Sequence, residues 1–210
     1  MTSTTLIRSL VAFASLAFLL PPAAGELLAD GILVPAGHQP VAIVAAELDG
    51  QPGVDVATVA DDTGTLSILC NQGDGTFAPP VLTVIEADVN QYSLYATDFD
   101  DDLDTDLVVG RGGEPLQIFL NDGSGNFTPG QTLATNGLYT KREICVGDID
   151  HDGDKDILWG NQLFGGGLWL AVNEGGTFAA PVELVYRWAD DPVLAHLDGD
   201  PHLDVAFHRH

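Results

Sequence analysis

Residues 148–156 read Asp-Ile-Asp-His-Asp-Gly-Asp-Lys-Asp, with an aspartate at five of the nine positions. These aspartates would repel one another, because like charges about 4 Å apart near a protein surface interact by roughly 4 kcal/mol. A calcium ion removes this repulsion, since Ca²⁺ takes about 6–8 oxygen ligands from carboxylates, carbonyls and water. Gly153 at position 6 allows the sharp turn that such a loop needs. The predicted ligands are the side chains at positions 1, 3, 5 and 9 and the carbonyl at position 7, namely Asp148, Asp150, Asp152, Asp156 and Asp154.

The same spacing recurs in three other places, so we number the acidic loops in chain order: loop 1 (47–55), loop 2 (98–106), loop 3 (148–156) and loop 4 (196–204). The loops begin 51, 50 and 48 residues apart. A fixed period of this length indicates a propeller, a solenoid or an array. The candidate metal-binding residues are Asp98, Asp100, Asp102, Asp104 and Asp106 in loop 2, Glu47, Asp49, Gln51, Gly53 and Asp55 in loop 1, and Asp198, Asp200, His202 and Asp204 in loop 4.

The segments between the loops follow a second repeating pattern. Each acidic loop is flanked by short apolar or alternating runs that are typical of strands, and a segment from Asn to Phe then separates two more. These segments are residues 71–77, 121–127 and 173–178. Four short strands in about 50 residues are typical of a propeller blade. The sequence therefore predicts an all-β, β-propeller-like fold with three complete four-stranded blades (about 41–86, 92–135 and 143–187) and a partial fourth (192–210).

The alternation of a D-x-D-x-D-G-x-x-D loop with an N-x-G-x-G-x-F turn resembles the FG-GAP/VCBS repeats of integrin α-chain-like β-propellers, over residues 41–207. The resemblance implies calcium in the acidic loops, on the underside of the propeller, and extracellular recognition such as cell adhesion. Propellers of the integrin type have seven blades. We therefore expect either a fragment of a longer propeller or an open arc, or a closed four-bladed ring completed by a strand at Leu27–Leu33. An open arc would be prone to self-association through its exposed blade edge.

Loops 1, 2 and 4 depart from the family pattern. Leu103 holds position 6 of loop 2, where the family often has glycine. In loop 1, Pro52 holds position 6, but three carboxylates and an amide remain to bind a cation. In loop 4, His196 holds position 1, and imidazole is a poor ligand for a hard cation. We expect structural calcium in loops 2 and 3, with up to four sites. The alternative is acidic turns held by backbone hydrogen bonds alone.

The composition limits the partners and the location of the protein. With 7 Lys and Arg against 31 Asp and Glu, the formal net charge is −24, which excludes nucleic acid and anionic membranes as partners. Residues 1–25 have the features of a secretory signal peptide, with Arg8 before an apolar run and small residues at 23–25. No stretch is apolar over the length that a membrane span requires. We expect residues 26–210 to form one secreted or cell-surface domain.

The cysteines and histidines give weaker signals. Cys70 and Cys145 could form a disulfide in an exported protein or could be two buried small hydrophobes. Four histidines near the C-terminus have no recognised metal-ligand spacing, and we interpret them as solvated or loop-capping side chains: His196, His202, His208 and His210.

No catalytic motif such as G-x-S-x-G, a Walker loop or a dinucleotide fingerprint occurs in the chain, so we nominate no catalytic or cofactor-binding residue. The predicted function is an exported, calcium-stabilised module that binds an extracellular protein or glycan and is not an enzyme. One alternative is a non-catalytic or catalytic part of a carbohydrate-active extracellular enzyme. Another is a purely structural piece of a larger surface protein. Trp188 is the best candidate for an exposed aromatic contact with a glycan.

Overall fold

The structure of the 210-residue chain is a computed structural model that describes residues 34–36, 39–60, 64–85, 92–111, 115–134, 140–161, 167–185 and 189–209. The predicted signal peptide, the predicted strand at Leu27–Leu33, Trp188 and His210 lie outside these residues. Within them, no helix is long and apolar enough to cross a bilayer.

The described residues form strands only, in four antiparallel sheets. Blade 1 has the order β1 (Pro40–Ala46), β2 (Asp55–Ala60), β3 (Thr65–Leu69), β4 (Val81–Val84). Blade 2 contains β5 (Tyr92–Thr97), β6 (Asp106–Arg111), β7 (Leu116–Asn121), β8 (Phe127–Leu133). Blade 3 contains β9 (Thr140–Gly147), β10 (Asp156–Asn161), β11 (Leu168–Ala171), β12 (Val182–Val185). Blade 4 is the hairpin β13 (Ala189–Ala195), β14 (Asp204–Arg209).

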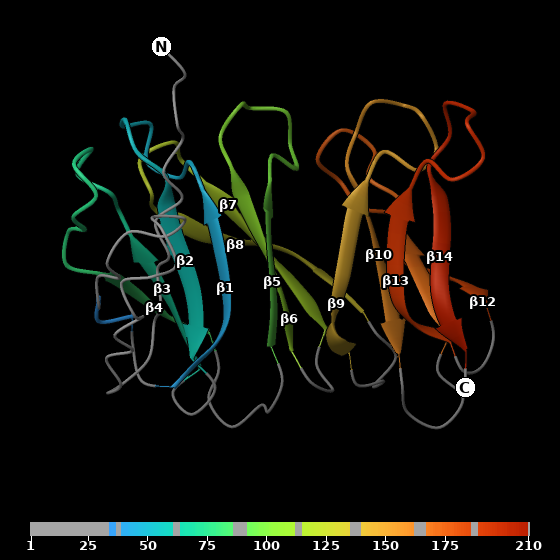
Figure 1. The fold of residues 1–210 in the computed structure, drawn as a ribbon, viewed down its shortest axis with the longest axis horizontal. Coiled ribbons are helices and arrows are strands. Elements are labelled where there is room, and N and C mark those ends of the chain that lie inside the picture. Colours follow the sequence, from blue (N-terminus) through green and yellow to red (C-terminus); the bar gives the residue numbers. More distant parts are fainter. Residues whose placement is uncertain are drawn as a thin grey trace, which may run out of the picture.

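The four sheets follow one another along an open arc (Figure 1). The first strands of the blades stand side by side in the order β1, β5, β9, β13. The acidic loops lie along one edge of the arc, where each of these strands ends (Figure 1). This architecture confirms the prediction of an all-β, propeller-like fold with three complete blades and a partial fourth.

The core lies between the blades. Neighbouring residues of an inner strand point to opposite faces of its sheet. Leu107 of β6 therefore packs against blade 1, whereas Val108 packs against blade 3. Both faces of this strand are covered, and all six residues of β6 are buried. Burial of each such side chain contributes about 1.5–3 kcal/mol, so the continuous apolar runs after the acidic loops hold the blades together.

The two ends of the arc differ. On the outer side of blade 1, Ala36 covers Val56 and Leu69, and its carbonyl accepts a hydrogen bond from Thr58 Oγ1 at 3.1 Å. At the other end, Leu197 at position 2 of loop 4 is 64% exposed. The equivalent Leu48 of loop 1 is 1% exposed, because a following blade covers it. The described residues thus leave the outward side of blade 4 open.

Candidate metal-binding loops

Loops 2 and 3 each gather three carboxylates around a common centre. In loop 2, oxygens of Asp98, Asp100 and Asp106 all lie within 4.8 Å of one another. In loop 3, Asp148, Asp150 and Asp156 are gathered in the same way. The structure therefore brings together the predicted residues at positions 1, 3 and 9, and their donor atoms are the oxygens that calcium prefers.

Two oxygens in these clusters are buried and have no hydrogen-bond partner, namely Asp100 Oδ1 and Asp148 Oδ1. Burial is the main cause that raises the pKa of Asp100, and the nearby charge of Asp102 adds to it. Buried polar atoms in proteins are nearly always satisfied by a protein group, water or an ion. A cation bound in each loop would therefore satisfy these two oxygens.

The aspartates at position 5 lie outside the three-carboxylate clusters. Asp102 and Asp152 are exposed, and Oδ1 of each accepts a hydrogen bond from the backbone N–H two residues later, at 2.9 Å. Such hydrogen bonds hold the loop tip in a turn. The predicted role of these two residues as calcium ligands stays a prediction.

The side chains at position 7 lie against the Asn-to-Phe segments, and the predicted role of the position 7 carbonyls as calcium ligands stays a prediction. Asp154, predicted to act through its carbonyl, accepts a hydrogen bond at Oδ2 from the Gly175 N–H at 2.5 Å. In blade 2, a Cβ added to Gly123 would lie 2.5 Å from Asp104 Oδ2. Each of these aspartates therefore faces the Asn-to-Phe segment of its own blade. The close approach requires glycine at Gly123, whereas a Cβ added to Gly175 would meet no atom within 4 Å.

The aspartate at position 9 joins the acidic loop to the Asn-to-Phe segment of the same blade. Asp106 Oδ2 accepts a hydrogen bond from Phe99 N at 2.9 Å, and Oδ1 accepts one from Asn121 N at 2.8 Å. Asp156 bonds Ile149 N and Asn173 N in the same way, at 2.8 and 2.9 Å. Asp55 repeats the pattern with the backbone N–H groups of Leu48 and Asn71, at 2.8 and 2.7 Å.

These three carboxylates are fully buried, and burial is the main cause that raises their pKa values, although the backbone N–H groups oppose it. The pKa of Asp106 rises to about 6. Positive charge near these groups would favour their ionised forms, so the electrostatics of loops 2 and 3 also suit a bound cation.

Asparagine side chains connect loops 1 and 2 to the blade that follows each of them. Asn121 Nδ2 donates to the Leu48 carbonyl of loop 1, and Asn173 Nδ2 donates to the Phe99 carbonyl of loop 2, both at 2.8 Å. Phe178 then packs edge-on against Phe99, with ring centroids 5.5 Å apart. The sequence interpretation treated these segments as turns and did not anticipate the asparagine hydrogen bonds between blades, although the recurring asparagine was their signal.

Loop 1 differs from loops 2 and 3 at position 1. Glu47 Oε1 accepts hydrogen bonds from the backbone N–H groups of Asp49 and Gly50, at 3.2 and 2.9 Å. The third member of the cluster with Asp49 and Asp55 is instead Cys70, whose pKa is raised to about 11, chiefly by burial. Gln51 is exposed, and Gly53 takes a φ of 137°. A protonated thiol is a poorer calcium ligand than a carboxylate.

Loop 4 forms no cluster of three metal-ligating side chains among the residues that the structure describes. Asp198 and Asp200 each accept a backbone N–H two residues later, and Asp204 Oδ2 accepts from Leu197 N at 2.7 Å. The His202 carbonyl at position 7 lies 2.9 Å from His196 Nδ1. The histidine at position 1 therefore caps the loop.

Position 4 has a left-handed backbone in all four loops. The φ angles are 70° at Gly50, 62° at Asp101, 68° at His151 and 89° at Gly199. Position 6 is left-handed in loops 2 and 3, at Leu103 and Gly153. The sequence interpretation considered only position 6, although the glycines at position 4 of loops 1 and 4 indicated the second turn.

The two cysteines do not form a disulfide. Cys70 lies beside loop 1, whereas Cys145 of β9 donates a hydrogen bond from Sγ to the Pro192 carbonyl of β13, at 2.7 Å. Cys70 therefore lies in blade 1, whereas Cys145 lies at the contact between blades 3 and 4.

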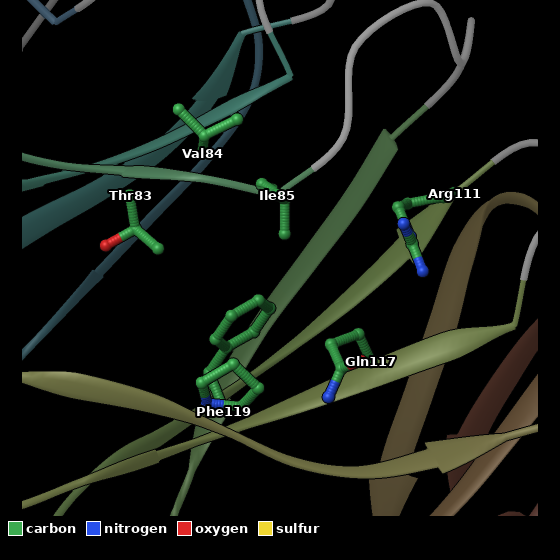
Figure 2. A pocket seen from close by; sticks show the side chains of 7 residues that line it. Thr83, Val84, Ile85, Arg111, Gln117 and Phe119 are labelled. Carbon is green, nitrogen blue, oxygen red and sulfur yellow. The ribbon is translucent and has the colours of Figure 1, made fainter.

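A cavity of about 250 Å³ lies where β4 of blade 1 meets blade 2, away from the acidic loops (Figure 2). Its wall includes Thr83, Arg111, Gln117 and the ring of Phe119. Figure 2 shows the Thr83 side chain on one side of the cavity and those of Arg111 and Gln117 on the other. Hydroxyl, guanidinium and aromatic groups thus line this cavity, whereas the Gln117 amide nitrogen already donates to the Ile118 and Gly130 carbonyls.

The comparisons with known proteins agree with this structure. Residues 98–159 match the FG-GAP-like repeat. A solved structure of an Agrocybe aegerita lectin, described as specifically recognising non-reducing terminal N-acetylglucosamine, has a TM-score of 0.54 and 20% sequence identity to this chain. The alignment covers 77% of this chain and 44% of that chain, and it supports the fold. No curated protein matches the chain.

The matched segment runs from position 1 of loop 2 to β10, through the Asn-to-Phe segment of blade 2 and the whole of loop 3. It therefore includes both three-carboxylate clusters and the segment between them. The match confirms, for residues 98–159, the resemblance that the two repeating motifs suggested: this segment carries an FG-GAP-like repeat.

Proposed function

We propose that the chain is an exported, calcium-stabilised module that binds an extracellular glycan or protein and is not itself an enzyme. Its export is supported by the signal-like pattern of residues 1–25, and its binding role by the FG-GAP-like repeat. The acidic surface favours recognition of neutral or cationic ligands over nucleic acid.

The observation that carries the calcium part of the proposal is the pair of buried oxygens without a hydrogen-bond partner, Asp100 Oδ1 and Asp148 Oδ1. Leaving such a group unsatisfied costs about 1–3 kcal/mol, and more when it is charged. One calcium ion would be held by Asp98, Asp100 and Asp106, and a second by Asp148, Asp150 and Asp156. Calcium supplies the positive charge that allows each loop to keep its carboxylates together.

We assign loops 1 and 4 to weaker sites, which brings the total to at most four. In loop 1, Asp49 and Asp55 are in place but Glu47 faces the backbone. In loop 4, the carboxylates bind backbone N–H groups of their own turn. Calcium sites of extracellular modules typically have dissociation constants of about 10⁻⁴–10⁻³ M, so the ion would be taken up outside the cell.

A glycan is the ligand class that the comparisons and the cavity favour. The lectin with a similar fold recognises a terminal N-acetylglucosamine, and the cavity between blades 1 and 2 offers polar groups beside an aromatic ring. Trp159 is unsuitable as an exposed platform, because it is 1% exposed in the core between blades 2 and 3.

The test is a glycan array together with an array of extracellular matrix proteins, probed with the mature chain in calcium and in EDTA. We expect binding in calcium that is lost in EDTA. Thr83→Val keeps the side-chain shape and removes the hydroxyl from the cavity, so it should weaken glycan binding about fivefold. Thr128→Val, at an exposed position of the outer strand β8 that pairs with Leu120 and not with a residue of the cavity wall, should leave it unchanged.

Each other outcome rejects part of the proposal. If the ligand binds equally well in calcium and in EDTA, the proposal that calcium supports ligand binding is wrong. Release of sugars from the array would favour a carbohydrate-active enzyme. Absence of binding to both arrays would favour a structural piece of a larger surface protein.

A further inference from the structure

Neighbouring acidic loops meet through the same two positions. Position 4 of one loop lies against position 7 of the next loop along the arc. Between blades 2 and 3 these residues are Asp101 and Asp154, and the proximity of the Asp154 carboxyl group is the main cause that raises the pKa of Asp101. Between blades 3 and 4 they are His151 and His202, whose rings are 4.4 Å apart between centroids and at 80° to each other.

The backbone at both histidines is held by the fold. His151 is at position 4, which is left-handed in every loop. The His202 N–H donates to Asp200 Oδ1 at 2.8 Å, and its carbonyl lies 2.9 Å from His196 Nδ1. The approach of the two imidazoles therefore follows from the stacking of blades 3 and 4, and it recurs with different side chains one blade earlier.

From this juxtaposition we propose that His151 and His202 together bind a divalent transition-metal ion of the Zn²⁺ class and thereby clamp the two-stranded blade 4 to blade 3. Zn–N bonds of about 2.0–2.1 Å place the rings of two ligands on one ion roughly 5 Å apart. A centroid separation of 4.4 Å reaches this geometry by small side-chain rotations. Both histidines are exposed, so water can fill the remaining positions around the ion.

This site is chemically distinct from the calcium sites. Imidazole nitrogen suits Zn²⁺, Ni²⁺ and Cu²⁺, whereas Ca²⁺ takes oxygen ligands. The inference does not rest on the proposed function, because it uses only the ring contact and the loops that position it. Among the described residues, blade 4 is the β13–β14 hairpin, and a metal link would add a contact between this hairpin and blade 3.

The test is calorimetric titration of the full chain with Zn²⁺ in a large excess of calcium, which keeps the carboxylate sites filled. His151→Asn is the appropriate variant, because asparagine tolerates the left-handed backbone at φ 68°. His202→Asn removes the other ring. The matched control is His208→Asn, on β14 of the same hairpin.

We expect each variant of the pair to weaken Zn²⁺ binding by about tenfold or more, and the control to change it less than about twofold. Affinities of the wild-type chain should rise from Mn²⁺ through Co²⁺ and Ni²⁺ to Cu²⁺. Zn²⁺ binding that is unchanged in both pair variants, or that calcium displaces competitively, would overturn the proposal by assigning the ion to carboxylates. Circular dichroism in calcium without Zn²⁺ establishes that each variant is folded.

Discussion

Leu103 occupies a backbone conformation that leucine tolerates poorly. It lies at position 6 of loop 2 with φ at 75°, and its side chain is 91% exposed. Gly153 holds the same position of loop 3. The left-handed conformation costs a residue with a Cβ atom about 1–2 kcal/mol, and the exposed side chain contributes little packing in return.

Leu103→Gly should therefore stabilise the protein, by about 0.5–1 kcal/mol after the larger entropy loss of glycine. Urea unfolding with calcium present measures this difference. The matched control is Thr105→Gly, two residues later in the same loop, where φ is not left-handed and glycine should destabilise. A loss of stability in Leu103→Gly would show that the loop backbone differs from the one described.

Substitutions at Asp156 and Asp152 distinguish the part of loop 3 that holds the fold from the part that binds metal. Asp156 is buried and uses both oxygens to accept backbone N–H groups. Asp156→Asn replaces one acceptor by an NH₂ group, so it should lower the free energy of unfolding by about 1–3 kcal/mol even in EDTA. Asp152 is exposed and uses Oδ1 alone.

Asp152→Asn retains that acceptor, so its free energy of unfolding in EDTA should match the wild type, while its calcium affinity should fall. Chemical denaturation in EDTA and calcium titration measure the two effects. Equal destabilisation by Asp152→Asn and Asp156→Asn in EDTA would contradict the division of roles between positions 5 and 9.

At the scale of the elements, the Asn-to-Phe segments determine how one blade lies on another. Asn173 is 1% exposed, donates to the Phe99 carbonyl of blade 2, and accepts the Gly176 N–H at 2.9 Å. One side chain therefore fixes its own turn and satisfies a carbonyl in the neighbouring blade. Such a residue is sensitive to truncation, because several buried groups lose their partners at once.

Asn173→Ala should lower the free energy of unfolding by about 2–3 kcal/mol. The control is Asn126→Ala, because Asn126 is exposed and bonds only Asp122 of its own turn; it should change stability by less than about 1 kcal/mol. Thermal and urea unfolding give both values. Similar losses from the two variants would argue against a stabilising contact between blades.

The elements were largely predictable, because the acidic loops and the alternating runs are local signals. One difference is that β8 begins at Phe127, the last residue of a segment expected to separate two strands, and includes Pro129 on an outer strand where proline is tolerated. The direction of loop side chains was not predictable. Glu47 has one methylene more than aspartate and can bend back to cap its own turn.

The contacts between loops could not be predicted from the sequence either. Cys70 joins loop 1 from the end of β3, and His151 meets His202 from a loop about 50 residues away. Periodicity aligns equivalent residues of different blades but does not state which positions of neighbouring blades touch. That information comes from the angle and spacing of the stacked sheets.

At the scale of the whole molecule, the chain combines a net charge of −24 with buried carboxylates. Burial raises the pKa of Asp106 from 3.8 to about 6 and raises those of Asp55 and Asp156. Between pH 4 and 6 the folded state therefore binds more protons than the unfolded state. Without metal, this makes the free energy of unfolding fall as the pH rises through that window.

For Asp106 the loss between pH 4 and 7 is up to about 3 kcal/mol, since one pKa unit corresponds to about 1.4 kcal/mol. Urea unfolding of the metal-free protein at several pH values measures the slope. Bound calcium favours the ionised carboxylates, so saturating calcium should flatten it. A metal-free protein that becomes more stable from pH 4 to 7 would contradict the direction of these shifts.

We claim that calcium stabilises loops 2 and 3, and the test is thermal unfolding of the protein in EDTA and in calcium. With dissociation constants of about 10⁻⁴–10⁻³ M, calcium at about 10 mM stabilises each site by roughly 1.4–2.7 kcal/mol. Two sites should therefore raise the melting temperature by roughly 10 °C. The double variant Asp100→Asn, Asp148→Asn should lose this increase. Identical melting curves for the wild type in EDTA and in calcium would contradict the claim.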